Sequence, residues 1–467
     1  MGGGQYEIEN KVLPGVYINI KSKPSMNVVM GERGIVAIAK QLSWGEQGKL
    51  IEIEGVNNLQ LLTGYSQTSP ENLFIRELMR GSNLTSGASK ILLWRLEETG
   101  GAKASLEVED GIKISTKYVG KRGNDIAVII SPVLESKNDE GTLYYQWTIE
   151  VVVDGLILES FTRGIYTGRD AGSVEATVKD FMDIESNWIQ VSGTETANLE
   201  TMVATNLTDG KDGTILPSAH NNFISAIAKV NFNVIVYDGE DTITKGAYKS
   251  LVNRLCTEEG RYCVAVISEY KADSEYVINV SNAFTNEEGV ALTTAQATWW
   301  VGGASAGANY WESLTYHNVP NASQVEPEYE NSELAKRLSA GEFLFFKMDD
   351  EIKVLSDVSS FTSVNVNKSK AFCKNRVVRT IMQICNDLYL GYSKYYIGIV
   401  DVNDAGVNLV KAYGIDYLNK VMAKNAIQNF VPDDYQVSQF EIDSMKIAMQ
   451  IQPVDSLEKI YIEMTIG

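Results

Sequence analysis

The stretch VIVYDGEDTITKGAYKSLVNRLCTEEGRYCVAVI, residues 234–267, decides the fold class of this chain. It begins with the apolar run Val234–Tyr237 and ends with the apolar run Tyr262–Ile267, and each run is typical of a strand that is buried on both faces. Residues 248–258, between these runs, have a helical pattern. Buried strands separated by a helix predict a parallel sheet that is covered by helices on both sides.

The chain before this stretch offers further elements of the same kind. Ile35–Ala39 and Ile91–Leu96 are short apolar runs, as expected of buried strands. A helix is predicted over residues 71–80, and Gly81 is a plausible stop for it. The apolar stripe of this helix consists of Phe74, Ile75, Leu78 and Met79.

A β-rich insertion is predicted over residues 97–190. Three runs indicate strands there, namely Ile126–Ile130, Tyr144–Val153 and Leu156–Phe161. Asp154-Gly155 separates the last two runs, and this dipeptide is a strong β-hairpin signal because both residues tolerate the positive φ of a tight turn.

The last third of the chain is predicted to contain two long helices followed by two strands. The helical stripes are Val377, Ile381, Ile384, Cys385 and Leu388 in the first helix, and Val410, Tyr413, Tyr417 and Val421 in the second. The strands alternate strictly, with Met445, Ile447, Met449 and Ile451 in the first and Ile460, Ile462, Met464 and Ile466 in the second.

Charge and composition exclude several classes of function. The net charge is −19 and the isoelectric point is near 4.7, which argues against a nucleic-acid surface because such surfaces depend on Lys and Arg. No apolar run approaches the roughly 20 residues that a membrane span needs. The start, MGGGQYEIEN, lacks the features of a secretory signal. We expect no direct contact with nucleic acid or membrane, and a protein kept in a cytoplasm until it is released.

No catalytic, cofactor-binding or metal-binding residue is predicted. His220 and His317 have no companion at ligand spacing, and the four cysteines fit no zinc pattern. The sequence contains neither a P-loop nor a Gly-x-Ser-x-Gly elbow. The glycine-rich run 302–307 follows a predicted helix and not a strand, so close packing of two elements explains it better than a phosphate cradle. We therefore expect no enzyme, although an oligomeric α/β enzyme remains an alternative.

Both ends of the chain carry strands with one apolar face. Near the start Val16, Ile18 and Ile20 alternate with polar or mixed residues, and the final strand, residues 460–466, runs almost to the last residue. An unpaired strand of this kind is an aggregation hazard, so each must pair with something.

Two outcomes for these strands are open. The C-terminal strand could form a hairpin with residues 445–452 through the turn Pro453–Ser456. Alternatively, each strand could join a sheet of a neighbouring subunit. Head-to-tail donation of this kind builds rings, helices or a lattice of both.

Short motifs along nearly the whole chain resemble those of the contractile tail sheath proteins of phages and phage-like particles, particularly those of Gram-positive hosts. The resemblance is densest from about residue 290 onward. The motifs are LPGVY at 13–17, KYVGKRGND at 117–125, WVGGASAG at 300–307 with SLTY at 313–316, KNRVVRT at 374–380, YIG at 396–398 with AIQNF at 426–430, and QPVDSLEKIY at 452–461.

The resemblance implies a structural subunit that uses no cofactor. Proteins of this kind form stacked six-membered rings around an inner tube, and their terminal strands join sheets of neighbouring subunits. Contraction repacks the subunits and drives the tube through a target cell envelope. The implied partners are further copies of the chain in a helical lattice of hexameric rings, the inner tail tube protein, and the baseplate and tail terminator proteins. The implied location is the tail sheath of a virion assembled in the host cytoplasm, with the sheath of an R-type bacteriocin or other contractile injection system as the alternative.

With this resemblance, the predicted fold is a multidomain chain of α/β and α+β class. Its expected parts are an N-terminal arm (1–25), the first part of the sheath core (26–96), the β-rich insertion (97–190), an α/β sheath domain (191–350), an α+β C-terminal tube-facing domain (351–456) and a C-terminal arm (457–467).

Two groups of site residues are predicted. The strands exchanged between subunits are expected to use Val16, Tyr17, Ile18 and Ile20 in the N-terminal arm and Ile460, Tyr461, Ile462, Met464 and Ile466 in the C-terminal arm. The candidates that face the tube are the basic residues Lys374, Arg376, Arg379, Lys420 and Lys424. An ion pair with Asp416, one helical turn away, is the alternative role for Lys420.

Overall fold

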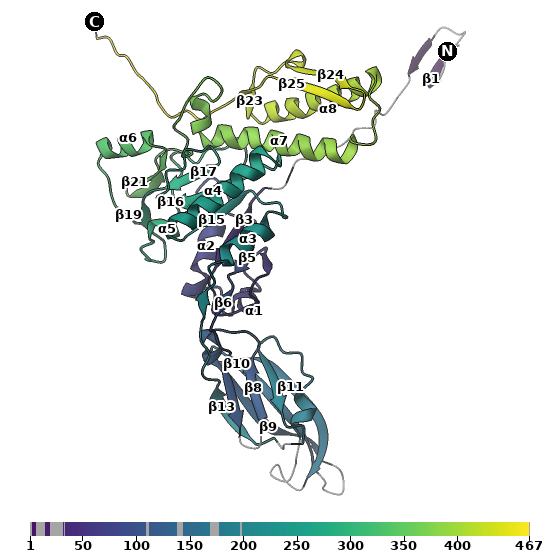
Figure 1. The fold of residues 1–467 in the computed structure, drawn as a ribbon, viewed down its shortest axis with the longest axis vertical. Helices are drawn as coiled ribbons and strands as arrows, with labels where there is room; N and C mark the ends of the chain where they lie inside the picture. Colours follow the sequence, from purple (N-terminus) through teal and green to yellow (C-terminus); the bar gives the residue numbers. More distant parts are fainter. Residues whose placement is uncertain are drawn as a thin grey trace. The chain divides into compact units, whose positions relative to one another are not determined.

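The computed structural model describes residues 2–5, 15–18, 31, 33–108, 112–137, 143–168, 177–196 and 199–466 (Figure 1). The chain divides into two compact units. One unit consists of Met1–Gly31 and Asp387–Pro453, and the other of Glu32–Asn386 and Val454–Gly467.

The larger unit contains a seven-stranded sheet, as residues 234–267 predict. Its strand order is β20-β17-β16-β15-β3-β5-β4, and all neighbours are parallel except β4 and β5. The strands are β3 (Ile35–Lys40), β4 (Leu50–Ile53), β5 (Lys90–Arg95), β15 (Val234–Tyr237), β16 (Val264–Ser268), β17 (Val277–Val280) and β20 (Glu342–Phe343).

Helices cover both faces of this sheet, which confirms the expected layers. Residues of α2 (Leu73–Arg80) and α5 (Thr294–Gly307) share one hydrophobic cluster with the strands. Residues of α3 (Ala219–Ile227) and α4 (Thr242–Thr257) share the other. The shorter helices α1 (Leu59–Thr63) and α6 (Asn331–Ser339) complete the helices of this part.

The glycine-rich run lies inside α5 and not after a helix, and it allows α5 to pack closely on its neighbours. A Cβ atom on Gly303 would be 1.9 Å from the backbone oxygen of Leu78 in α2, and one on Gly307 would be 2.2 Å from the backbone oxygen of Ser86. Only glycine permits this approach, so the expectation of close packing is confirmed.

The insertion is β-rich, as expected, but its strands continue past residue 190. One sheet has the order β12-β8-β7 and the other β11-β10-β9-β13, and their buried side chains form one core. The strands are β7 (Ser105–Val108), β8 (Ile112–Thr116), β9 (Ile126–Lys137), β10 (Leu143–Val153), β11 (Leu156–Gly168), β12 (Ile189–Gly193) and β13 (Met202–Asn206). Asp154 (φ 51°) and Gly155 (φ 78°) form the predicted hairpin turn.

The motif at residues 117–125 fastens the insertion to the main sheet domain. Gly120 approaches the backbone of Ser43 so closely that a Cβ atom would be 2.0 Å from the Ser43 oxygen. Arg122 donates from Nε to the Gly64 oxygen (2.7 Å) and from Nη2 to the Asp154 carboxylate (2.7 Å). The strands β6 (Glu98–Thr99) and β14 (Thr214–Ile215) pair at the point where the chain leaves the main sheet domain for the insertion and returns from it.

Two short antiparallel pairs complete the strands of the larger unit. β18 (Ala283–Thr285) pairs with β19 (Gln324–Glu326), and β21 (Phe345–Met348) pairs with β22 (Glu351–Val354).

The smaller unit is built on the two predicted long helices. They are α7 (Asn375–Tyr395), whose first part belongs to the larger unit, and α8 (Asp404–Ala423). Its antiparallel pairs are β23 (Ile427–Gln428) with β26 (Gln452–Pro453) and β24 (Tyr435–Glu441) with β25 (Ser444–Met449). β1 (Gly2–Gln5) and β2 (Gly15–Ile18) form a parallel pair.

The first of the two outcomes for the C-terminal strand, a hairpin within this chain, is not formed. Residues 454–466 have no regular secondary structure, and β25 pairs with β24 instead of with the C-terminal arm. The intramolecular hairpin between residues 445–452 and 460–466 is therefore wrong for the single chain.

The described residues also offer no sign of a metal site or membrane span. Within them, no group of three or more His, Cys, Asp or Glu side chains is arranged to hold a metal ion. None of the helices described above is long and apolar enough to cross a membrane.

Candidate functional site at the base of the C-terminal arm

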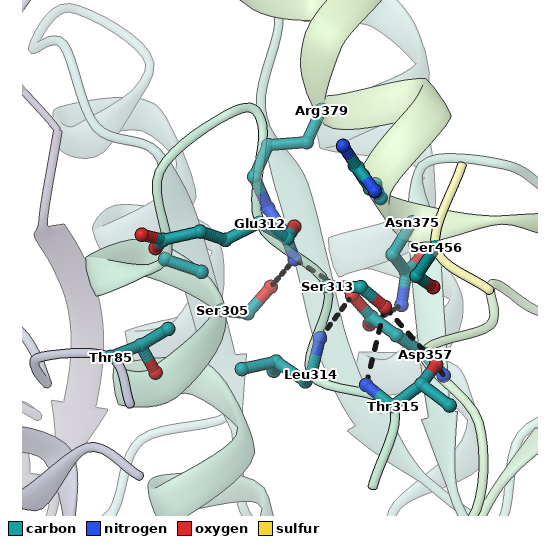
Figure 2. Close-up of polar contacts among 12 residues, drawn as sticks. Thr85, Ser305, Glu312, Ser313, Leu314, Thr315, Asp357, Asn375, Arg379 and Ser456 are labelled. Carbon is teal, nitrogen blue, oxygen red and sulfur yellow. Dashed lines mark hydrogen bonds and ion pairs between the residues drawn. The ribbon is translucent and has the colours of Figure 1, made fainter. Parts of the chain in front are cut away.

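A buried carboxylate, Asp357, organises a polar network in the larger unit (Figure 2). Its side chain is 1% exposed and lies in the loop after β22. One carboxylate oxygen accepts from Asn375 Nδ2 (2.8 Å) and the other from the backbone N–H of Leu314 (3.1 Å). The backbone N–H of Asp357 donates to Thr315 Oγ1 (2.9 Å). Asp357 thus joins the SLTY segment to the first turn of α7.

Arg379 is the charge partner of Asp357 in this network. Its side chain is 5% exposed, and Nη2 lies 3.4 Å from the Asp357 carboxylate. Nη1 donates to the backbone oxygen of Glu312 (2.8 Å), and Nη2 also reaches Ser305 Oγ on α5 (3.4 Å), as Figure 2 shows. A buried ion pair needs such additional hydrogen bonds to offset the cost of leaving water.

The base of the C-terminal arm joins the same network through Glu458. Its Oε1 accepts from Thr315 Oγ1 (3.0 Å) and Ser356 Oγ (2.9 Å), and its Oε2 accepts from Lys374 Nζ. Lys374 Nζ donates a second hydrogen bond, to Ser356 Oγ (3.0 Å). Burial opposes ionisation of Glu458, but the hydrogen bonds from its three partners outweigh it and lower the pKa of this carboxyl below its usual value.

The arm beyond Glu458 carries large apolar side chains that are exposed. Tyr461 is 88% exposed and Ile466 is 89% exposed. The exposed fractions of Ile460, Ile462 and Met464 are 73%, 83% and 79%. The apolar side chains that the sequence predicts for this arm are exposed, and none of the described residues of the chain covers them.

The predicted residues of the N-terminal arm are described only in part. Val16, Tyr17 and Ile18 lie in β2, whose backbone pairs with β1. Ile20 lies outside the described residues.

The basic candidates differ in burial and in their partners. Arg379 is buried against Asp357, which leaves it no surface for a partner, so the structure argues against its predicted role. Lys374 pairs with Glu458, and Arg376 is half-buried. Lys420 forms the ion pair with Asp416 (2.9 Å) that was the alternative, with both side chains about half exposed, and Lys424 is exposed.

The sequence did not single out Asp357, Thr315, Ser356 or Glu458 as interacting residues. Thr315, Glu458 and the basic residues of α7 lie within the SLTY, QPVDSLEKIY and KNRVVRT motifs, but the motifs gave no sign that they meet. Asp357 and Ser356 belong to none of these motifs. No signal in a single sequence distinguishes Asp357 from the other acidic residues.

Comparisons with known families match three parts of the chain. The model of the phage tail sheath protein central domain matches residues 213–360, and that of the phage tail sheath C-terminal domain matches residues 367–467. The model of the tail sheath protein Gp18 domain III N-terminal region matches residues 33–96.

Individual proteins are similar over nearly the whole chain. The phage-like element PBSX protein XkdK of Bacillus subtilis is 29% identical over 100% of both chains. The crystal structure of a sheath tail protein from Desulfitobacterium hafniense is 35% identical, covers 96% of this chain and 99% of its own, and has a TM-score of 0.79. A chain of the anti-feeding prophage helical sheath in its contracted state, 12% identical, shares the fold with a TM-score of 0.53 over 97% of this chain and 99% of its own.

Proposed function

Because this chain belongs to the phage tail sheath protein family, we propose that it polymerises as stacked hexameric rings around an inner tube and contracts to drive the tube through a target cell envelope. The chain is a structural component of the tail sheath of a phage or phage-like contractile system. The hexameric rings, the inner tail tube protein, the baseplate and tail terminator proteins, and assembly in the host cytoplasm are parts of the proposal.

The exposed C-terminal arm carries this proposal. Residues 460–466 alternate apolar and polar or mixed side chains, and their apolar face is open to solvent in the single chain. Adding such a strand to the sheet of a second copy forms about four to six backbone hydrogen bonds, each contributing about 0.5–1.5 kcal/mol. With its apolar face included, one donated strand stabilises the contact between copies by several kcal/mol.

The hairpin β24–β25 is the proposed acceptor of donated strands. Two strands alone form a marginal sheet, and most side chains of β24 and β25 are exposed, including Ile447 and Met449. Within the described residues no third strand pairs with this hairpin. Strands from neighbouring copies would extend it and cover its apolar side chains.

The N-terminal arm is proposed to cross between copies as well, through residues 14–21. Its β2 pairs with β1 over only four residues, Gly15–Ile18, and a pair of this length is weak. An alternative acceptor with a longer edge would therefore compete with β1.

The experiment is truncation of each arm followed by electron microscopy. Full-length protein should form striated tubes. Variants that lack residues 1–21 or 459–467 should remain folded by circular dichroism and give no long sheaths, because the connections between copies are lost. Long sheaths from both truncated proteins would refute exchange of the arms.

The sheath of an R-type bacteriocin or other contractile injection system is the second candidate. It is favoured by the similarity to a protein of a phage-like element. The subunit would be nearly the same in both cases, so the whole particle has to distinguish them. Purified tails with a capsid attached support a phage. Purified tails without a capsid, together with the absence of capsid genes beside the gene for this chain, support the bacteriocin.

A further inference from the structure

The hydrogen bonds of Glu458 divide the C-terminal arm into a fixed base and a free part. Val454 and Ser456 are partly buried, whereas Asp455 and Leu457 are exposed, so Glu458 with its three side-chain partners is the main attachment of this base. Lys459 and every residue after it up to Ile466 are exposed. Glu458 is therefore the last partly buried residue of the described arm.

The three partners of Glu458 form a preorganised receptor for a carboxylate. Thr315 Oγ1 is oriented by the backbone N–H of Asp357, which donates to it (2.9 Å). Lys374 Nζ donates to Ser356 Oγ (3.0 Å), which fixes the ammonium group beside the carboxylate. Groups held in place in this way lose little conformational freedom when they bind a charge, so the contact is stronger than a pair of mobile surface residues.

We propose that Glu458 is the fixed point of the C-terminal arm: it stays bound to Thr315, Ser356 and Lys374 of its own subunit, and only residues 459–466 cross to a second copy. This inference rests on the proposed exchange of arms and adds where the exchanged part begins. The crossing part then has a reach of about 25 Å when it is extended. A pull on the crossing strand is transmitted to α7 through Lys374.

Proteolysis of the full-length, unassembled protein tests whether the base is bound. Trypsin cleaves after Lys459 only when the residues on both sides of the bond, Glu458 included, enter its active site in extended form. Cleavage therefore requires Glu458 to leave its three partners. The released peptide, residues 460–467, is measured by mass spectrometry.

Lys374→Met and Glu458→Gln should each accelerate this cleavage roughly tenfold or more, because a hydrogen bond to a charged group is lost. Lys374→Met leaves the sequence around the cleaved bond unchanged. Glu458→Gln changes the residue before Lys459, so its cleavage rate is divided by the rate for a free peptide with the same substitution. Lys370→Met is the matched control, since Lys370 is exposed and four residues earlier in the chain, and its rate should stay within about twofold of wild type. Circular dichroism confirms that each variant is folded. A wild-type cleavage rate in folded Lys374→Met would overturn the proposal.

A density map of the assembled sheath separates this inference from the proposed function. Glu458 bound to Lys374 of its own subunit, with residues 459–466 paired to another copy, supports both. Glu458 detached while the strand still crosses overturns the fixed point and leaves the exchange intact. Residues 459–466 paired within their own subunit overturn the exchange.

Discussion

At the residue scale, two ion pairs of this chain illustrate how burial decides the importance of a charge. Arg379 and Asp357 are 5% and 1% exposed, whereas the side chains of Lys420 and Asp416 are 48% and 58% exposed. Water screens the exposed pair, which contributes little to stability. The buried pair is costly to form, but removing one partner leaves an uncompensated charge inside the protein.

Asp357→Ala should therefore lower the free energy of unfolding by about 3–5 kcal/mol, because it leaves the Arg379 guanidinium buried without its carboxylate. Denaturant titration measures the change. Asp416→Ala is the matched control and should cost less than about 1 kcal/mol. Equal effects of the two substitutions would contradict the role of burial.

The pKa of Glu458 gives a second test at this scale. Its carboxyl should titrate below the ordinary value of about 4.3. Because the pKa is lower in the folded than in the unfolded chain, the stabilisation is complete above about pH 4.3 and is lost as the pH falls through the folded value.

Carbon-13 labelling of glutamate, with Glu458→Gln to assign the signal, measures this pKa. In Lys374→Met the pKa of Glu458 should rise, because the variant lacks the ammonium group that stabilises the carboxylate. The hydrogen bonds from Thr315 and Ser356 remain. A pKa that does not respond to Lys374 would show that the ion pair does not form.

At the element scale, periodicity identified the long helices and the strongly apolar or alternating strands, but not their packing. The sequence predicted a helix over residues 71–80 that stops at Gly81; the structure confirms the helix and its end, but α2 begins at Leu73, after a 3-10 turn over Pro70–Asn72. It also predicted that the small residues at 302–307 allow a close approach, but not that the neighbour is the backbone of Leu78. Periodicity is a local property, whereas the neighbour is chosen by the packing of the whole domain.

Gly303→Ala should destabilise the larger unit by about 3 kcal/mol, because a Cβ atom would be 1.9 Å from the Leu78 oxygen and the helices would have to separate. Gly246→Ala, in α4, is the matched control. There a Cβ atom would meet only Tyr270 Oη, at 3.5 Å, and alanine should stabilise the helix by about 0.5–1 kcal/mol. Thermal unfolding of both variants compares them, and destabilisation of similar size would contradict the packing argument.

At the scale of the whole molecule, the two units differ in how far their sheets are covered. The larger unit has extensive hydrophobic clusters on both faces of its sheet and a third in the insertion. The smaller unit has a two-stranded hairpin whose side chains are largely exposed. We propose that this unit is completed by neighbouring copies and that α8 contacts the tube.

Charge reversal on α8 tests the proposed contact with the tube. Lys420→Glu with Lys424→Glu should reduce co-assembly with an acidic tube protein at least tenfold, because attraction becomes repulsion, and the effect should weaken at high salt. Lys336→Glu with Lys347→Glu, two exposed lysines of the other unit, is the matched control. Co-sedimentation with the tube protein measures binding. Normal co-assembly of the variant with both substitutions would show that α8 does not contact the tube.

By itself, the sequence determined the local elements: the parallel strands and their helices, the Asp154-Gly155 hairpin and the alternating apolar face of residues 460–466. Only the tertiary structure showed that Thr315, Asp357, Arg379 and Glu458 meet in one network, because residues this far apart are joined by folding and not by spacing. It also showed that the final strand does not form within the single chain. Alternation shows that a segment can be a strand, but a strand forms only where an edge accepts its backbone hydrogen bonds, and residues 460–466 pair with no strand in the described part of this chain.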